Sequence, residues 1–130
     1  MSTSPAEIEF LGELIAVPSL SGSEDAAARL VERRAMALGL DVVRDESSVR
    51  VSVGDEGSGP TLALASHLDV VPPGDGWTRD PFVPVLEGGL VYGRGSGDAK
   101  ASVSAMLYAL SDAAAGVRQM GHGRLLAIFS

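Results

Sequence analysis

Cysteine is absent from the 130 residues of this sequence. Disulfide bonds and thiolate metal ligands are therefore excluded, so a metal ion would have to be held by nitrogen and oxygen donors. No apolar run approaches the roughly 18 residues that span a bilayer, and the first residues lack the basic and apolar segments of a signal peptide. These absences predict a cytoplasmic protein with no membrane partner.

Positive charge is scarce, with 10 Lys and Arg residues against 17 Asp and Glu residues and a net charge of -7. A chain of this charge lacks the basic surface that binds phosphate backbones, which argues against nucleic acid as a partner. Apolar residues make up 45% of the sequence and no low-complexity tract is present, so the chain should fold around a packed interior. Its length suits one domain or part of one.

Apolar residues at helical spacing predict three helices. The first covers residues 5–16. The second has an apolar stripe over residues 27–38, after which Gly39 suits a left-handed C-terminal end. The third has its apolar face over residues 103–114 and is predicted to end near Gly116.

Strand-forming segments alternate with these helices. Residues 40–53 alternate polar and apolar side chains, which predicts two edge strands, whereas residues 61–65 form an apolar run expected at the sheet centre. Short strands are predicted at residues 90–92 and 124–129, and the long irregular segment 68–89 is typical of a functional loop. The pattern predicts an α/β fold, a layered mixed sheet with flanking helices.

Two candidate site residues follow directly on the apolar run. The carboxyl ends of strands in open α/β sheets collect ligands and catalytic groups, and His67 stands at such an end. Asp69 lies two residues on, so in extended chain it points to the same side and can orient the imidazole. An isolated His-x-Asp pattern is a weak signal, because a histidine there is more often a hydrogen-bonded surface residue.

A third candidate, Asp98, stands between a glycine-rich turn and the third predicted helix. As a plain N-cap, its carboxylate would accept a backbone N–H. As a metal ligand, it would use the close backbone approach that the glycines at 93, 95 and 97 allow, and its two oxygens could bridge two cations. The residues alone leave these two interpretations about equal.

Together these motifs resemble a known enzyme family. The string SHLDVVPPGDGWTRDPFVPVLEGGLVYGRGSGDAKAS, residues 66–102, is similar to the two-zinc metallopeptidases that include acetylornithine deacetylase, succinyl-diaminopimelate desuccinylase, aminoacylase and the glutamate carboxypeptidases. The resemblance rests on His-x-Asp-x-Val-Pro at 67–72, Trp77 with the Asp-Pro-Phe at 80–82, Gly-Arg-Gly at 93–95 and Asp-x-Lys at 98–100. It implies the zinc peptidase catalytic fold, with a phosphorylase/hydrolase-like sheet.

The resemblance also assigns roles. It implies that His67 ligates one zinc ion, that Asp98 bridges both, and that Asp69 acts as a catalytic residue by orienting His67. It implies a cis peptide bond after Asp98, and cobalt or manganese as alternatives to zinc. Residues 1–130 would form the N-terminal part of the catalytic domain. A glutamate pair, further ligands and a dimerisation domain would lie beyond Ser130, so the chain alone should be inactive and the parent enzyme a homodimer.

The leading functional hypothesis is hydrolysis of the amide bond of an N-acyl amino acid, with the stretch DGWTRDPF most like acetylornithine deacetylase. Zinc dipeptidase, carboxypeptidase and succinyl-diaminopimelate desuccinylase activities are alternatives within the family. A non-catalytic binding or interaction domain is the alternative of another class, because His67 and Asp98 are fewer than the ligands of ordinary zinc sites. Lys100 and His122 are predicted to be surface side chains.

Overall fold

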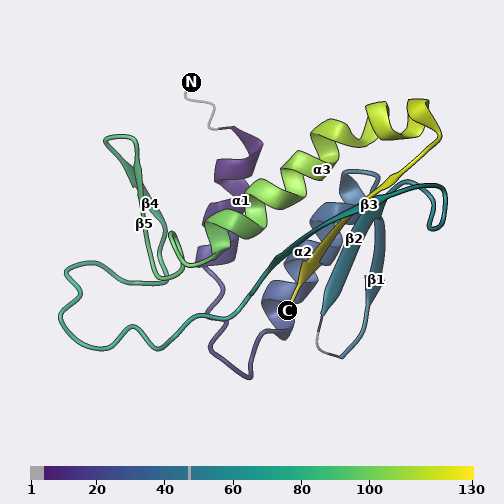
Figure 1. Cartoon of the computed structure of the whole chain (residues 1–130). Helices are drawn as coiled ribbons and strands as arrows, with labels where there is room; N and C mark the ends of the chain where they lie inside the picture. The colour runs from purple at the N-terminus through teal and green to yellow at the C-terminus, as the bar shows by residue number, and fades with distance from the viewer. Residues whose placement is uncertain (1–4, 47) are drawn as a thin grey trace.

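The computed structural model describes residues 5–46 and 48–130. Its elements, in chain order, are α1 (Ala6–Ile15), α2 (Asp25–Ala37), β1 (Asp41–Arg44), β2 (Val49–Val53), β3 (Thr61–Ser66), β4 (Val85–Glu87), β5 (Leu90–Tyr92), α3 (Lys100–Met120) and β6 (Arg124–Phe129) (Figure 1). The predicted α/β fold with a layered mixed sheet is confirmed.

The main sheet has the strand order β1-β2-β6-β3. β2 pairs antiparallel with β1 and with β6, whereas β3 and β6 are parallel. The predicted central position of residues 61–65 is wrong for the described chain, because β3 is an edge strand. The prediction of two edge strands holds for β1 and is wrong for β2. An apolar run indicates how far the faces of a strand are covered, but it does not specify the neighbouring strands. After α3 the chain forms β6, which lies between β2 and β3 and leaves β3 at the edge.

The helices bury one face of the sheet. Val49, Val51 and Val53 of β2 are at most 1% exposed, while Arg50 between them is exposed. The same hydrophobic cluster contains side chains of all three helices and of β6, among them Phe10, Leu14, Val31, Ala35, Val103, Leu107, Leu110, Ala127 and Phe129. The opposite face is less covered, and Ala65 of β3 is exposed there.

Helix α3 is longer than predicted. It continues past Gly116 to Met120 and ends at Gly121, which has φ 63° in the left-handed region. A glycine inside a helix costs only about 1 kcal/mol relative to alanine, so packing of the following turn overrides it. No helix in the described part of the chain has both the length and the apolarity needed to cross a bilayer.

The segment predicted to be irregular contains a strand. β4 pairs antiparallel with β5 around Gly88 and Gly89, whose φ values are 62° and 78°, as in a two-residue hairpin turn. β4 has three residues, too few for an alternating pattern to be visible in the sequence, whereas β5 matches the strand predicted at residues 90–92. The hairpin projects from the body of the molecule on the side of α1 (Figure 1).

The buried face of α3 should carry much of the stability. Leu107 is 0% exposed within the core, and Leu107→Ala should lower the free energy of unfolding by about 3 kcal/mol, because it removes buried methyl groups and leaves a cavity. Met120→Ala, at a side chain 70% exposed on the same helix, is the matched control and should change it by less than about 0.5 kcal/mol. Urea denaturation measures both; equal losses would contradict the assigned core.

Candidate metal centre

Hydrogen bonding continues past the end of β3 and positions the two candidate residues there, His67 and Asp69. Leu68 is 2% exposed, and its N–H donates to the carbonyl oxygen of Ser130 at 2.6 Å, beyond the end of β6. Because side chains alternate in extended chain, burial of Leu68 turns His67 and Asp69 the other way. The carboxyl end of β3 therefore presents an imidazole and a carboxylate together.

The structure brings the three predicted site residues together. His67 Nε2 lies 2.8 Å from Asp98 Oδ1. Its other ring nitrogen, Nδ1, lies 3.0 Å from the backbone oxygen of Asp69 and 3.1 Å from Asp69 Oδ1. The side chain of Asp98 is 91% exposed, so it can still reach another ligand. The predicted cis peptide bond between Asp98 and Ala99 is confirmed.

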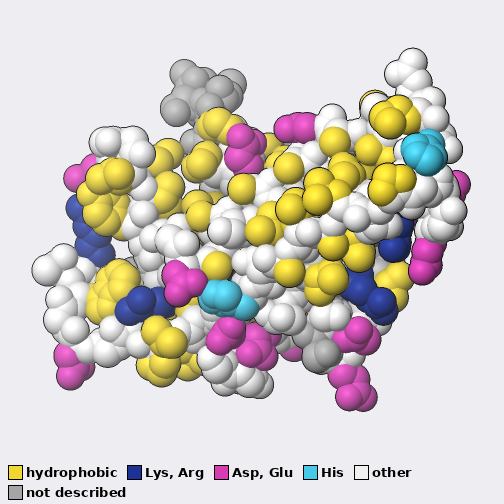
Figure 2. Space-filling model, in the orientation of Figure 1, with side chains coloured by type: hydrophobic (Ala, Val, Ile, Leu, Met, Phe, Trp, Pro, Cys, Tyr) yellow, Lys and Arg dark blue, Asp and Glu magenta, His cyan; other side chains and the backbone are white. Residues whose placement is uncertain are grey.

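The carboxylates perturb the titration of this imidazole. The hydrogen bond to Asp98 is the main cause that raises the pKa of His67 above its usual value, and the backbone and charge of Asp69 add to it. The pKa of Asp69 is lowered, mainly because the Ser21 hydroxyl donates to its Oδ2 at 2.5 Å. On the face shown in Figure 2, acidic side chains gather around a histidine.

The loop after α1 supports this end of the site. Ser21 bonds Asp69, and the Ser19 hydroxyl donates to the carbonyl of Leu68 at 2.7 Å. The Val70 N–H in turn donates to the Ser19 carbonyl at 2.8 Å. These contacts join positions nearly 50 residues apart, which no local pattern could reveal. Ser21 is therefore a supporting residue that sequence reasoning missed.

Lys100 is buried, contrary to the prediction of a surface lysine. Its side chain is 0% exposed, and Nζ donates to the carbonyl oxygens of Leu14 at 2.6 Å and Val17 at 2.7 Å. Burial lowers its pKa to about 8, so it is still mainly a cation at neutral pH. The carbonyls at the end of a helix carry partial negative charge and suit a cation. Lys100 thus fastens the start of α3, two residues after Asp98, to the end of α1.

One glycine before Asp98 is required by close packing. Gly95 has φ 88°, and a Cβ there would lie 2.8 Å from Val70 Cγ1 and 3.0 Å from Lys100 Cδ. Its carbonyl accepts the Lys100 N–H at 2.9 Å. A side chain at this position would therefore displace the turn that carries Asp98.

The donor set fits a divalent transition-metal ion, as part of a site. An imidazole nitrogen and a carboxylate oxygen converge, with a second carboxylate holding the far side of the ring, and such donors suit zinc, cobalt or manganese. Within residues 5–46 and 48–130 there is no group of three or more His, Asp or Glu side chains that could hold a metal ion. Ordinary zinc sites use three or four protein ligands, so His67 and Asp98 would need further donors.

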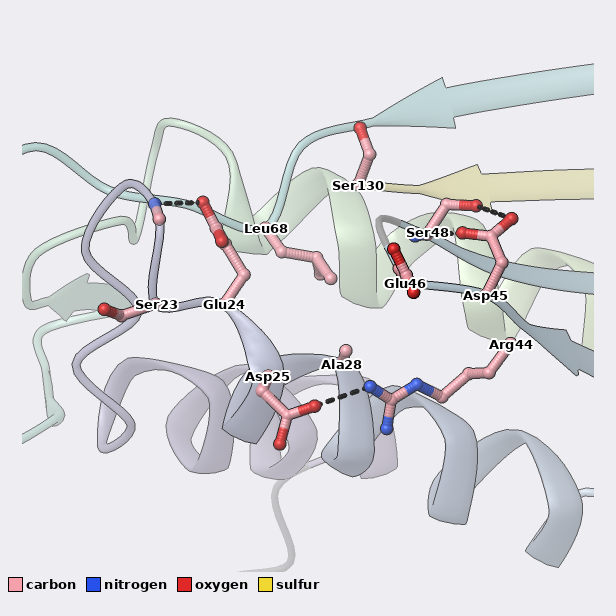
Figure 3. A pocket seen from close by; sticks show the side chains of 11 residues that line it. Ser23, Glu24, Asp25, Ala28, Arg44, Asp45, Glu46, Ser48, Leu68 and Ser130 are labelled. Carbon is pink, nitrogen blue, oxygen red and sulfur yellow. Dashed lines mark hydrogen bonds and ion pairs between the residues drawn. The ribbon is translucent and has the colours of Figure 1, made fainter.

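The site lies in a cavity of about 300 Å³, lined by His67, Asp69, Asp98 and the Gly93–Gly97 turn. A larger cavity of about 380 Å³ lies between the start of α2 and the β1–β2 turn (Figure 3). Two of its acidic groups have partners: Asp25 pairs with Arg44 at 2.6 Å, and Glu24 accepts the Gly22 N–H at 2.7 Å. His122 lines a separate cavity and is exposed, as predicted.

The chain matches one family model and is similar to several solved structures. The model of peptidase family M20/M25/M40 matches residues 63–129. An M20 family metallo-carboxypeptidase from Sulfolobus solfataricus superposes with a TM-score of 0.81 at 21% identity, covering 98% of this chain and 31% of that chain. A tripeptidase from Staphylococcus aureus gives a TM-score of 0.69 at 25% identity, over 95% and 35% of the two chains.

A third similar structure comes from Bacillus subtilis. A dinuclear metal-binding peptidase of the M20 family from Bacillus subtilis has a TM-score of 0.66 at 19% identity, covering 95% of this chain and 34% of that chain. The chain therefore spans about a third of the length of these proteins. These likenesses bear out the predicted fold.

The hydrogen bond between His67 and Asp98 has a measurable consequence. In metal-free protein, Asp98→Asn should lower the pKa of His67, because it removes the main group that stabilises the imidazolium. Because the pKa of His67 is raised in the folded chain, the interaction of the imidazolium with Asp98 stabilises the fold at low pH. This stabilisation is lost as the pH rises through the pKa of His67. Zinc affinity should have the opposite pH dependence to this stabilisation. It should fall as the pH drops below the pKa of His67, because protons compete with zinc for Nε2. NMR titration of the His67 ring measures the shift; Asp112→Asn, on the exposed side of α3, is the control. An unchanged His67 pKa in Asp98→Asn would contradict the contact.

Lys100 should contribute more to zinc binding than a neighbouring side-chain hydrogen bond between α3 and α1. One turn along α3, Ser104 Oγ donates to the Glu7 carbonyl at 2.6 Å and also joins α3 to α1. Lys100→Met should weaken zinc binding about tenfold, as loss of groups that position metal ligands commonly does. Ser104→Ala should leave zinc affinity unchanged while lowering stability. Calorimetric titration with zinc, with urea denaturation of each variant, separates the two; equal affinities would refute the role of Lys100.

Proposed function

The chain belongs to peptidase family M20/M25/M40, and on that premise we propose that it supplies part of the metal centre of a metal-dependent amide hydrolase. The observation that carries the proposal is the convergence of His67 Nε2 and Asp98 Oδ1, 2.8 Å apart, at the carboxyl end of β3. A metal ion bound by both groups would replace the hydrogen bond that now joins them.

Each residue has a distinct role in this proposal. His67 would donate its Nε2 lone pair to the metal, and Asp69 would keep the proton on Nδ1, which orients the ring and makes it a better ligand. Asp98, with a side chain 91% exposed, would offer its two oxygens to two ions. The described chain has no cysteine, so all its donors are nitrogen and oxygen.

Two bound zinc ions would lower the pKa of a water molecule and polarise the amide carbonyl under attack. The chain's own task is to hold the ligands rigidly, and it does so through Lys100 and through Ser21. We propose that the missing ligands and the general base come from polypeptide outside residues 1–130. The relatives, about three times as long, have room for them, and we propose that the parent enzyme is a homodimer.

The substrate class is a small amide. We propose an N-acyl amino acid, with N-acetylornithine the first to test, because residues 75–82 resemble acetylornithine deacetylase. A short peptide is the second candidate, and the names of the similar tripeptidase and carboxypeptidase structures favour it. Both classes place one scissile amide close to a carboxylate.

The test uses an enzyme that contains this chain with the rest of its parent protein, loaded with zinc. N-acetylornithine, succinyl-diaminopimelate and a dipeptide are compared as substrates, with ninhydrin detection of the released amine. His67→Ala and Asp98→Ala should abolish hydrolysis, Asp69→Asn should reduce kcat/KM by about 10- to 100-fold, and His122→Ala should change nothing. Cleavage of the dipeptide alone would refute the narrower substrate proposal.

The non-catalytic alternative makes a different prediction. With two metal ligands the chain alone should bind zinc weakly, whatever the parent enzyme does. A parent protein that binds zinc no more tightly than this chain, and hydrolyses none of the three amides, would favour a binding or interaction domain. Tight stoichiometric binding by the chain alone would contradict the proposal that ligands are supplied from elsewhere.

A further inference from the structure

The outer edge of β3 has no neighbouring strand within the described chain. β3 and β1 are the two ends of the strand order β1-β2-β6-β3 (Figure 1). The Ser66 carbonyl accepts the Ser130 N–H at 3.2 Å, so Ser66 turns its backbone groups toward β6. Backbone groups alternate in direction along a strand, and those of Thr61, Ala63 and Ala65 therefore point to the open edge.

β3 lacks the features that usually protect an edge strand. Its six residues, TLALAS, include no charged side chain and no proline, whereas β1 has Asp41 and Arg44 among its four residues. Natural edge strands use charge, proline or short length to prevent pairing with another chain. Leu62 is 59% exposed, and Ala63 and Ala65 are exposed as well. Of the two ends of the sheet, the β3 edge is the one suited to pairing with a further strand.

We propose that two copies of this chain associate by antiparallel pairing of their β3 edges. A twofold axis perpendicular to the sheet would bring Ala63 opposite Ala63 of the second copy, and Thr61 opposite Ala65. All three residues point their N–H and C=O groups to the edge, so the residues of each pair can exchange two hydrogen bonds. Pairing would join the two four-stranded sheets into one continuous sheet.

The side chains favour this register. Leu64 packs against the core, and Leu62 lies on the same face of the strand but is largely exposed. Leu62 would lie opposite Leu64 of the second copy, in a pair whose side chains approach closely, so the contact would cover an exposed leucine. The next register that keeps the same faces together would set Leu62 opposite Ser66 and draw His67 into the contact. The favoured register leaves the metal-site residues outside the pairing.

Charge favours a second copy over a partner of opposite charge. The chain has a net charge of -7, so two copies repel each other over most of their surfaces. This repulsion is weakest where neither side contributes charge, as along β3. A basic partner would find no carboxylate on this strand, whereas an identical strand matches it residue by residue. Each copy has one such edge, so the association would close at a dimer.

Sedimentation velocity of the 130-residue chain over a series of concentrations tests the association. The average mass should rise with concentration toward that of a dimer and then stop rising. A chain that stays monomeric throughout would overturn the proposal, because the β3 edge would then have another occupant or none. Growth beyond the dimer would also overturn it, because a different surface would have to be responsible.

A charge placed at the twofold axis identifies the contact. Ala63→Lys sets two like charges directly opposite each other and should weaken the dimer at least about fivefold, and Ala63→Glu should do the same. Val43→Lys, at a side chain 55% exposed on β1, changes the net charge equally and should alter the dimer dissociation constant less than about twofold. Equal weakening by Ala63→Lys and Val43→Lys would contradict the β3 contact. Urea denaturation checks that each variant folds.

Mixing the two Ala63 variants tests the symmetry directly. Ala63→Lys mixed with Ala63→Glu would bring opposite charges together at the axis, so the mixed dimer should be at least about fivefold tighter than either variant alone. A mixture of Val43→Lys and Val43→Glu is the matched control and should show no such preference. A mixed Ala63 dimer no tighter than its parents would overturn the proposed register. Neither measurement involves zinc or hydrolysis, so the proposal stands or fails independently of the hydrolase function.

Discussion

A buried ammonium group connects the metal-site residues to the rest of the molecule. Lys100 Nζ bonds two carbonyls at the end of α1, and its carbon chain lies against the glycine turn that precedes Asp98. A buried charge with imperfect partners would be costly, so the end of α1 and the start of α3 must stay in register. Asp98 stands two residues before this lysine, so its position depends on the same contact.

The segment between α1 and α2 supports both parts of the candidate site. At one end its Val17 carbonyl accepts a hydrogen bond from Lys100 Nζ, and at the other Ser19 and Ser21 bond Leu68 and Asp69. The family motif over residues 66–102 therefore depends on a segment outside it. Since His67 follows β3 and Asp98 precedes α3, the sheet positions one of the two proposed ligands and the start of a helix positions the other.

The charges closest to the His67 ring are negative. Two carboxylates flank the His67 ring, and their hydrogen bonds and charges favour its protonated form when no metal is bound. A metal ion would replace that proton with a larger positive charge, which two carboxylates tolerate better than one. Arg94 is also among the lining residues, but its guanidinium lies over the Trp77 ring and forms no ion pair with these acidic groups.

Local patterns in the sequence determined the element types and most element bounds. Those patterns left the roles of His67, Asp69 and Asp98 open, and the prediction of one site came from the resemblance of residues 66–102 to a metallopeptidase family. Tertiary structure alone decided that β6 separates β2 from β3, that Lys100 is buried, and that Ser21 supports Asp69. The reason is physical: hydrophobic periodicity reports which side of an element is apolar, whereas strand order and buried polar partners depend on segments nearly 50 or more residues away.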